Sequence, residues 1–113
     1  PLLIAPYETS PGTSESAAAY ALCYRCHDRN SILNNQSFPG HRQHIVDQRT
    51  SCATCHDAHG IPITGGTHSG NAHLINFDLT SVQALPEKPI SYDADTGTCT
   101  LSCHGKVHDG LAY

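Results

Sequence analysis

Three short cysteine motifs constrain this chain more than any other feature. Residues 23–27 read CYRCH and residues 52–56 read CATCH, so both have the form C-x-x-C-H. Residues 99–104 read CTLSCH, with three residues between the cysteines instead of two. We call these the first, second and third motifs. They contain all six cysteines of the chain, and a histidine follows each pair directly.

C-x-x-C-H is the attachment sequence of a c-type haem. Each of two thiols at this spacing can add to one vinyl group of the same porphyrin, and the histidine becomes an axial ligand of the iron. We therefore expect three covalently bound haems. The expected thioether residues are Cys23, Cys26, Cys52, Cys55, Cys99 and Cys103. The expected proximal iron ligands are His27, His56 and His104.

Two other kinds of site would also use the cysteines. Six cysteines in an exported chain could form three disulfides, and the four cysteines of the first two motifs could bind zinc. Neither explains a histidine after every second cysteine, nor nine histidines in 113 residues. At the third motif the extra residue must loop out when haem is attached. The alternative for this motif is a disulfide beside an ordinary histidine.

The protein part offers little material for a hydrophobic core. Leu, Ile, Val and Phe together make up 21 of the 113 residues, and small domains are marginally stable even with a normal core. We therefore expect the porphyrins to supply much of the apolar bulk. The six cations form no basic stripe, which argues against a nucleic-acid partner. Charged residues are only 14% of the chain, so neutral polar side chains or another subunit must cover its surface.

The sequence predicts a single trihaem unit that is mostly irregular, with a few short α-helices and little or no sheet. Residues 1–20 are expected to form an apolar extended arm that leads into a helix, and residues 21–60 hold the first two motifs. A loop-rich insert is expected over 61–98, and residues 99–113 hold the third motif.

Short helices are expected around each motif and in one segment between them. Ser14 as the N-cap and three consecutive alanines favour the first of these helices. The helical ranges are 15–26, 41–49, 51–58 and 99–106. Segments 30–40, 61–70 and 81–97 are rich in Pro, Gly or Asn and are expected to be loops or turns. Residues 73–78 form a compact apolar segment that could be a short strand.

The second axial ligand of each iron is expected to be another histidine. The chain contains no methionine, which excludes His/Met ligation within it. Six histidines lie outside the motifs, and three irons need only three of them. The candidate distal ligands, in order of preference, are His44, His41, His59, His73 and His108. The sixth, His68, lies in a Gly-rich turn and ranks last.

Spacing supports this order. His41 and His44 are three residues apart on one face of an expected helix, so they suit two neighbouring irons. His59 follows the proximal histidine of the second motif by three residues, so it would bind an adjacent haem and not its own. The alternative for His73 is a buried histidine bonded to backbone, and His108 lies four residues after His104.

These motifs resemble those of multihaem c-type cytochromes of the doubled CxxCH kind. Residues 41–44 (HRQH) resemble an element that supplies distal ligands to two haems, and residues 52–60 (CATCHDAHG) resemble cytochromes that polymerise into extracellular filaments. The resemblance covers residues 23–60 well and residues 99–108 fairly. It implies low-potential bis-histidine haems and contacts between copies of the chain, in which a distal histidine can come from the next subunit.

The sequence therefore predicts electron transfer through three haems, in a subunit of an extracellular cytochrome filament. One alternative is a soluble periplasmic trihaem shuttle, although only two lysines are present for a basic docking surface. Another is a haem reductase, which would need an iron with an open coordination position. We expect an electron carrier and not an enzyme. No apolar run approaches the roughly 18 residues that span a bilayer, so no membrane span is expected. Partner cytochromes or extracellular acceptors would exchange electrons with it.

Overall fold

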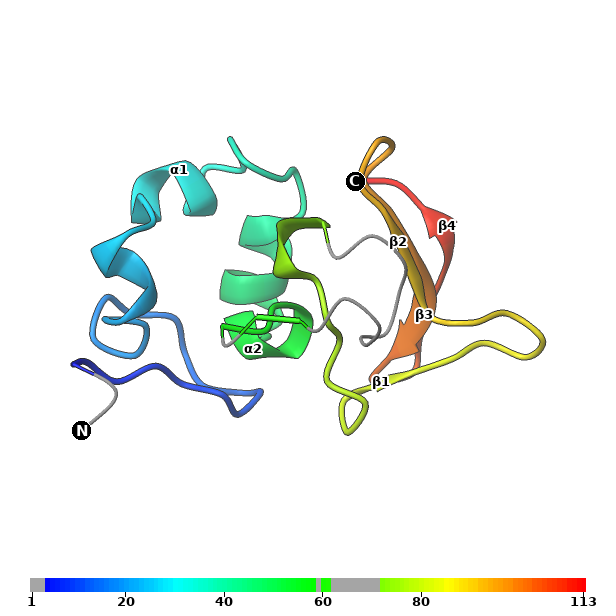
Figure 1. Cartoon of the computed structure of the whole chain (residues 1–113), viewed down its shortest axis with the longest axis horizontal. Coiled ribbons are helices and arrows are strands. Elements are labelled where there is room, and N and C mark those ends of the chain that lie inside the picture. Colours follow the sequence, from blue (N-terminus) through cyan, green and yellow to red (C-terminus); the bar gives the residue numbers. More distant parts are fainter. Residues whose placement is uncertain (1–3, 59, 62–71) are drawn as a thin grey trace. The chain divides into compact units, whose positions relative to one another are not determined.

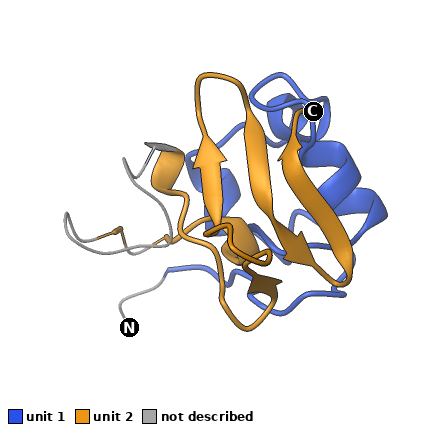
Figure 2. Cartoon of the chain, turned by 90° about the vertical axis from the view of Figure 1, so that its right-hand side faces the viewer, with its two compact units in different colours: residues 1–52 blue, residues 53–113 orange. Residues whose placement is uncertain are grey.

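The structure, a computed structural model, describes residues 4–58, 60–61 and 72–113. The chain divides into two compact units, residues 1–52 and 53–113, which are coloured separately in Figure 2. The division falls inside the second motif, directly after Cys52. The first unit therefore contains the first motif, and the second unit contains the third.

The helices of the described residues are short. They are η1 (Cys23–Arg25, a 3-10 turn), α1 (Arg29–Leu33), η2 (Gln43–Asp47, a π-helix), α2 (Cys52–Cys55) and η3 (Ala72–Leu74, a 3-10 turn) (Figure 1). The helices expected around 41–49 and 51–58 are present in shortened form as η2 and α2. No helix in the described ranges has the length and apolar composition needed to cross a membrane.

Two expectations about the helices of the first unit are wrong in detail. Residues 17–22 form successive turns that lead into η1, and not one helix over 15–26. The hydroxyl of Ser16, rather than that of Ser14, accepts the capping hydrogen bond, from the N–H of Ala19 at 3.0 Å. Segment 30–40 was expected to be loop, yet it contains most of α1. The Asp28 side chain caps this helix by accepting from the N–H of Ser31 at 2.7 Å.

The first unit is held together by a small core and by its N-terminal arm. Tyr20 and Ile45 are its buried hydrophobic residues, with 1% and 7% of their surfaces exposed. Beside them, Thr50 and Ser51 are buried polar residues. The hydroxyl of Ser51 donates to the carbonyl of Thr9 at 2.9 Å, so the arm is tied to its own unit.

The expectation of little or no sheet is wrong, because the second unit contains a four-stranded antiparallel sheet. Its strands are β1 (Val82–Gln83), β2 (Ser91–Asp93), β3 (Thr98–Cys103) and β4 (Lys106–Leu111) (Figures 1 and 2). β3 is the central strand: β1 and β2 pair with its two halves, and β4 pairs along most of its length. The segment 81–97, expected to be a surface connection, supplies two of these strands.

The third motif forms a strand and a turn instead of the expected helical turn. Residues 98–101 alternate Thr-Cys-Thr-Leu, and β-branched residues at alternate positions favour strand. His104 and Gly105 follow with φ of 49° and 78°. Positive φ at both central residues of a two-residue loop is the type I′ turn that joins antiparallel strands. This turn connects β3 to β4, with Cys103 opposite Lys106.

One face of the sheet covers the core of the second unit. Ile75, Phe77, Val82 and Leu101 form this core, each with 7% or less of its surface exposed. Partly buried side chains pack around it: Cys55, Ile90, Tyr92, Cys99 and Cys103. The compact apolar segment over 73–78 supplies Ile75 and Phe77. It forms one isolated bridge, between Ile75 and His56, in place of a full strand.

Candidate haem-attachment sites

The first motif places its two cysteines on one helical turn. The N–H groups of Cys26 and His27 donate to the carbonyl of Cys23 at 3.2 and 3.0 Å, which closes the turn. In a 3-10 turn, residues three apart eclipse each other. Cys23 is half-buried, whereas Cys26 and His27 are exposed. The turn therefore brings the two cysteines close along the backbone and leaves Cys26 and His27 accessible from outside the unit.

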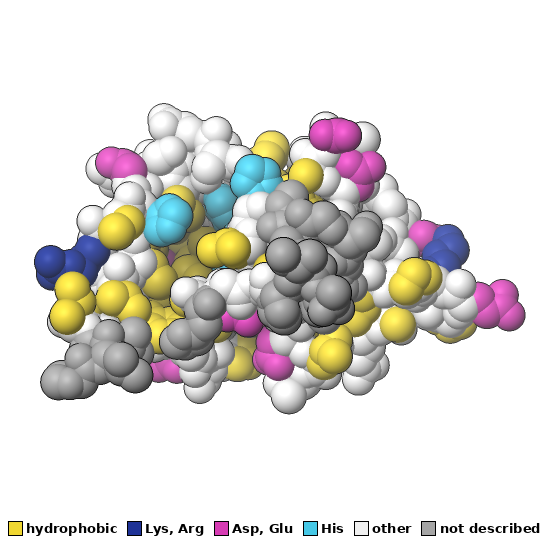
Figure 3. Space-filling view, viewed as in Figure 1, with side chains coloured by type: hydrophobic (Ala, Val, Ile, Leu, Met, Phe, Trp, Pro, Cys, Tyr) yellow, Lys and Arg dark blue, Asp and Glu magenta, His cyan; other side chains and the backbone are white. Residues whose placement is uncertain are grey.

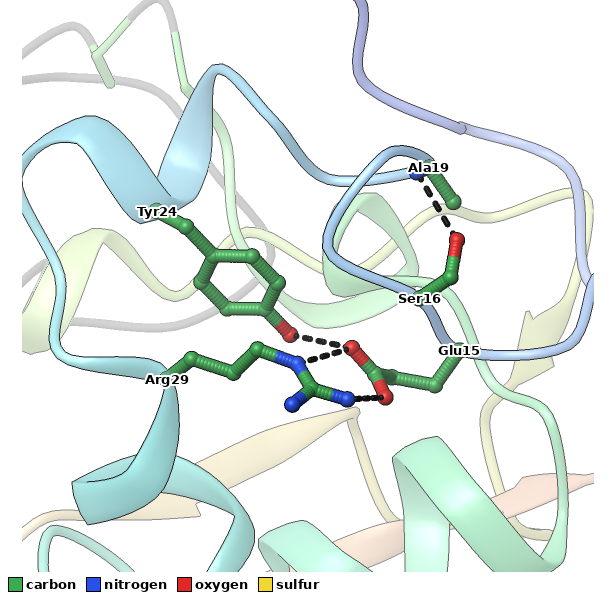
Figure 4. Close-up of polar contacts among 5 residues, drawn as sticks. All are labelled: Glu15, Ser16, Ala19, Tyr24 and Arg29. Atoms are coloured by element: carbon green, nitrogen blue, oxygen red, sulfur yellow. Dashed lines mark hydrogen bonds and ion pairs between the residues drawn. The ribbon is translucent and has the colours of Figure 1, made fainter.

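A polar clamp holds this turn in place (Figure 4). Tyr24, inside the motif, donates from its hydroxyl to Glu15 Oε1 at 3.0 Å. Arg29 Nε donates to the same oxygen at 2.8 Å, and its Nη2 donates to Oε2. The guanidinium also lies 5.9 Å from the centre of the Tyr24 ring. No sequence pattern indicates this clamp, because three residues spaced irregularly over 15 positions match no helical or strand period.

The clamp changes the acidity of its members. The Arg29 hydrogen bonds are the main cause that lowers the pKa of Glu15, and the Tyr24 hydroxyl adds to the effect. Burial, followed by the bond to Glu15, raises the pKa of Tyr24. The Glu15 side chain is only 6% exposed. The clamp therefore consists of an ionised carboxylate, a guanidinium and a neutral phenol at neutral pH.

The second motif forms α2, and hydrogen bonds fix the C-terminal end of that helix. Carbonyls in the last turn of a helix have no partner within it. Here the N–H of Asn76 donates to the carbonyl of Cys55, and the N–H of Asp78 donates to the carbonyl of Thr54, both at 2.9 Å. These bonds come from the segment that supplies the core of the second unit. The orientation of the second motif is thus set by that core.

His56, the expected proximal ligand of the second motif, is oriented by a backbone carbonyl. Its Nδ1 lies 2.9 Å from the carbonyl oxygen of His73. A carbonyl can only accept, so Nδ1 carries a proton, and the neutral ring has its lone pair on Nε2. Histidines that bind metals through one ring nitrogen commonly donate from the other in this way. His56 therefore has the tautomer that suits an iron ligand.

The third motif does not fit a haem in this conformation. Cys99 and Cys103 lie at the two ends of β3, and four residues of antiparallel strand cover about 13 Å. Residues three apart on a helical turn are about 5–6 Å apart. Both thiols pack against the core of the second unit, while His104 lies exposed in the turn. The two thiols and the histidine do not converge on one cofactor face.

Burial makes several of the thiols weak acids. It raises the pKa of Cys52 to about 12 and that of Cys99 to about 11. It also raises the pKa values of Cys23 and Cys103. These thiols are protonated at neutral pH, and thiols in this state react slowly.

Two candidate distal ligands lie together in the first unit. His44 belongs to η2, and its Nδ1 lies 2.7 Å from the carbonyl of Gly40, which places the ring proton on Nδ1. His41 lies two residues before η2, with Nδ1 3.1 Å from the hydroxyl of Ser37 and its ring against Phe38. Both are half-buried. Histidine side chains reach the surface among hydrophobic ones in Figure 3.

The other distal candidates have different surroundings. His73 is exposed, contrary to the alternative of a buried histidine, and has φ of 55°. His108 lies on β4 opposite Leu101 and is 7% exposed, with Nδ1 2.6 Å from the hydroxyl of Tyr113. His104 lies in the turn of the hairpin and His108 lies on its second strand, so the two residues are not on one helical turn. His59 and His68 lie outside the described residues.

A disulfide within the third motif does not fit this geometry. All six cysteines are free thiols. A disulfide between Cys99 and Cys103 would require Cα atoms closer than about 7 Å, which β3 prevents. Among the residues that the structure describes, no three His, Cys, Asp or Glu side chains converge as ligands for a metal ion.

Comparisons of the chain with protein-family models, with curated proteins and with solved structures find no match.

Proposed function

We propose that this chain is an electron-transfer protein with covalently bound c-type haems. The observation that carries the proposal is the arrangement of the second motif. Cys52 and Cys55 lie on one helical turn, and His56 follows with its proton placed on Nδ1 by the carbonyl of His73. Paired thiols and a histidine with this tautomer are what covalent attachment and axial ligation require.

When bound, a c-type haem supplies a one-electron iron couple. The residues of the chain determine what that couple can be used for. His27 and His56 are the proximal ligands in this proposal, and His44 and His41 lead the distal candidates. Histidine on both sides of an iron fills its coordination positions, which favours electron transfer over substrate chemistry. The clamp of Glu15, Tyr24 and Arg29 keeps the first motif in its turn.

A third haem at Cys99 and Cys103, with His104 as proximal ligand, belongs to the same proposal. It requires β3 to leave the sheet, because four residues of strand separate the backbone positions of the two cysteines by about 13 Å. The type I′ turn at His104 would open at the same time. Haem attachment at the third motif thus requires a change of backbone conformation, which the two helical motifs do not need.

Assembly into an extracellular filament is the form of the proposal that the resemblance of the motifs favours. Exposed apolar residues such as Ile4, 72% exposed, offer surface for another copy. Negative-stain electron microscopy of the exported protein tests this point. Filaments are the expected result, and only monomers by microscopy and size-exclusion chromatography would favour the soluble periplasmic shuttle.

Spectroscopy of the exported protein tests the electron-transfer function. The chain would be produced in a bacterial host that attaches c-type haems, with a variant in which all six cysteines are serine as the control. We expect haem absorption bands that survive denaturation and an entirely low-spin ferric electron paramagnetic resonance spectrum. Absence of covalent haem would contradict the proposal. A substantial high-spin signal would favour the haem reductase instead.

A further inference from the structure

The first cysteines of the two helical motifs lie against each other in the first unit. The thiols of Cys23 and Cys52 lie close enough for each to shift the pKa of the other. Tyr20, which is 1% exposed, lies near both sulfurs. The second cysteines lie elsewhere: Cys26 is exposed, and Cys55 packs against the core of the second unit. The first cysteines of the two helical motifs therefore interact across the motifs within the first unit.

One end of the N-terminal arm is bonded to the segment that leads into the first motif. The N–H of Leu22 donates to the carbonyl of Pro6 at 3.0 Å. The N–H of Glu8 donates to the carbonyl of Ala19 at 2.8 Å. These bonds fix the backbone directly before Cys23.

The other end of the arm is bonded to the segment that leads into the second motif. The N–H of Gly12 donates to the carbonyl of Arg49 at 2.8 Å, and the hydroxyl of Ser51 donates to the carbonyl of Thr9 at 2.9 Å. The arm therefore fixes the backbone on both sides of the thiol pair. The contact between Cys23 and Cys52 is a product of the fold and not of chance collision.

We propose that the haem-free chain forms a Cys23–Cys52 disulfide, which blocks both helical motifs until it is reduced. The bond occupies one thiol of each motif, so neither motif retains the two thiols that haem attachment needs. The disulfide itself stands independently of the proposed function, whereas its effect on haem attachment rests on that function.

The step is a thiol–disulfide exchange with a disulfide oxidant. The two S–H bonds break, one S–S bond of about 2.05 Å forms, and two protons and two electrons leave. The electrons reduce the oxidant to two thiols. A dithiol reductant reverses the step and restores both cysteines. Cys23 is the attacking sulfur, because it is less buried than Cys52. Burial keeps both thiols protonated, so the bond should form slowly and faster as pH rises.

Peptide mapping of the haem-free chain tests the proposal. The full chain would be purified reduced, exposed to oxidised glutathione, alkylated and digested with trypsin without reduction. Arg25 separates Cys23 from Cys26, so cleavage there distinguishes their pairings. We expect residues 1–25 to be linked to the peptide that contains Cys52. The link should persist in C26S and C55S, disappear in C23S and C52S, and be lost in urea.

Other pairings would overturn the proposal. Bonds within a motif, Cys23 to Cys26 or Cys52 to Cys55, as the main product would show that the thiol contact does not direct oxidation. The absence of any disulfide at high pH over hours would do the same.

A second measurement separates this proposal from the proposed function. The oxidised and reduced chains would be incubated with haem under identical anaerobic conditions, and covalent haem would be counted by intact mass. We expect at least a tenfold lower attachment at both helical motifs in the oxidised chain, restored by a dithiol. Equal attachment in both chains would overturn the blocking role. If the chain forms the disulfide but attaches no haem even after the disulfide is reduced, the proposed function is overturned. The proposed Cys23–Cys52 disulfide would still stand.

Discussion

The first two motifs present their cysteines on helical turns, whereas the third presents them along a strand. The same residue types therefore have two different backbone geometries in one chain. In η1 and α2 the cysteines are three residues apart on one turn, and in β3 they are four residues apart in extended structure. A cysteine motif therefore determines the possible chemistry, while the flanking residues determine whether the two thiols converge.

The largest expected effects concern haem content. Replacing Cys52 and Cys55 by serine should remove the haem of the second motif completely, because no thiol remains to form a thioether bond. Replacing Cys99 and Cys103 by serine should leave both helical motifs loaded. Intact mass and peptide mapping of the exported variants give the count. Loss of haem from the helical motifs in the Cys99/Cys103 variant would break the proposed distinction between the two geometries.

The sheet that holds the third motif should depend on its central core residue. Leu101 is 5% exposed and lies between the two cysteines of β3. Leu101→Ala should lower the free energy of unfolding of the haem-free chain by about 2–5 kcal/mol, through lost burial and a cavity. Urea denaturation followed by circular dichroism measures this change. Val107→Ala, at a position 57% exposed on the neighbouring strand, is the matched control and should change it little.

The clamp on the first motif should have a smaller effect with a defined pH dependence. Glu15→Gln should cost about 1–2 kcal/mol, between the values of exposed and buried ion pairs. The pKa of Glu15 is lowered from its ordinary 4.5 in the fold. The ionised Glu15 therefore contributes its full stabilisation at pH values above its ordinary pKa. This stabilisation is lost as the pH falls through the lower pKa that Glu15 has in the folded chain.

Denaturation of both chains across the acidic range tests the Glu15 prediction. The difference between Glu15→Gln and the unsubstituted chain should shrink as the pH falls below about 4. Glu87→Gln, at an exposed position, is the control. A difference that stays constant down to the lowest pH would show that the clamp stabilises the motif through packing and not through the charge of Glu15.

The smallest effect is expected at the exposed ion pair on the sheet. Lys88 Nζ lies 2.7 Å from Asp109 Oδ1, but both side chains are more than half exposed. Asp109→Asn should therefore change the free energy of unfolding by less than about 1 kcal/mol. A larger loss in urea denaturation would mean that this pair, and not the core around Leu101, holds the strand geometry of the third motif.

The sequence allowed prediction of a helical turn at the second motif but not of the strand at the third motif. The helices expected over 41–49 and 51–58 are present in shortened form as η2 and α2, because local spacing and composition favour helix there. At residues 99–106 the haem motif suggested a helical turn. The alternation Thr98, Thr100 and the turn residues Gly97 and Gly105 are signals for a hairpin. They prevailed because β1, β2 and β4 supply partners that lie outside the motif.

The most direct test of the two geometries is the order in which the motifs acquire haem. The chain would be exported in a haem-attaching host with limiting haem, and peptide mapping would locate each attached group. We expect chains that carry haem at Cys23/Cys26 and Cys52/Cys55 and are bare at Cys99/Cys103. Chains that carry haem at Cys99/Cys103 while both helical motifs remain bare would contradict this expectation.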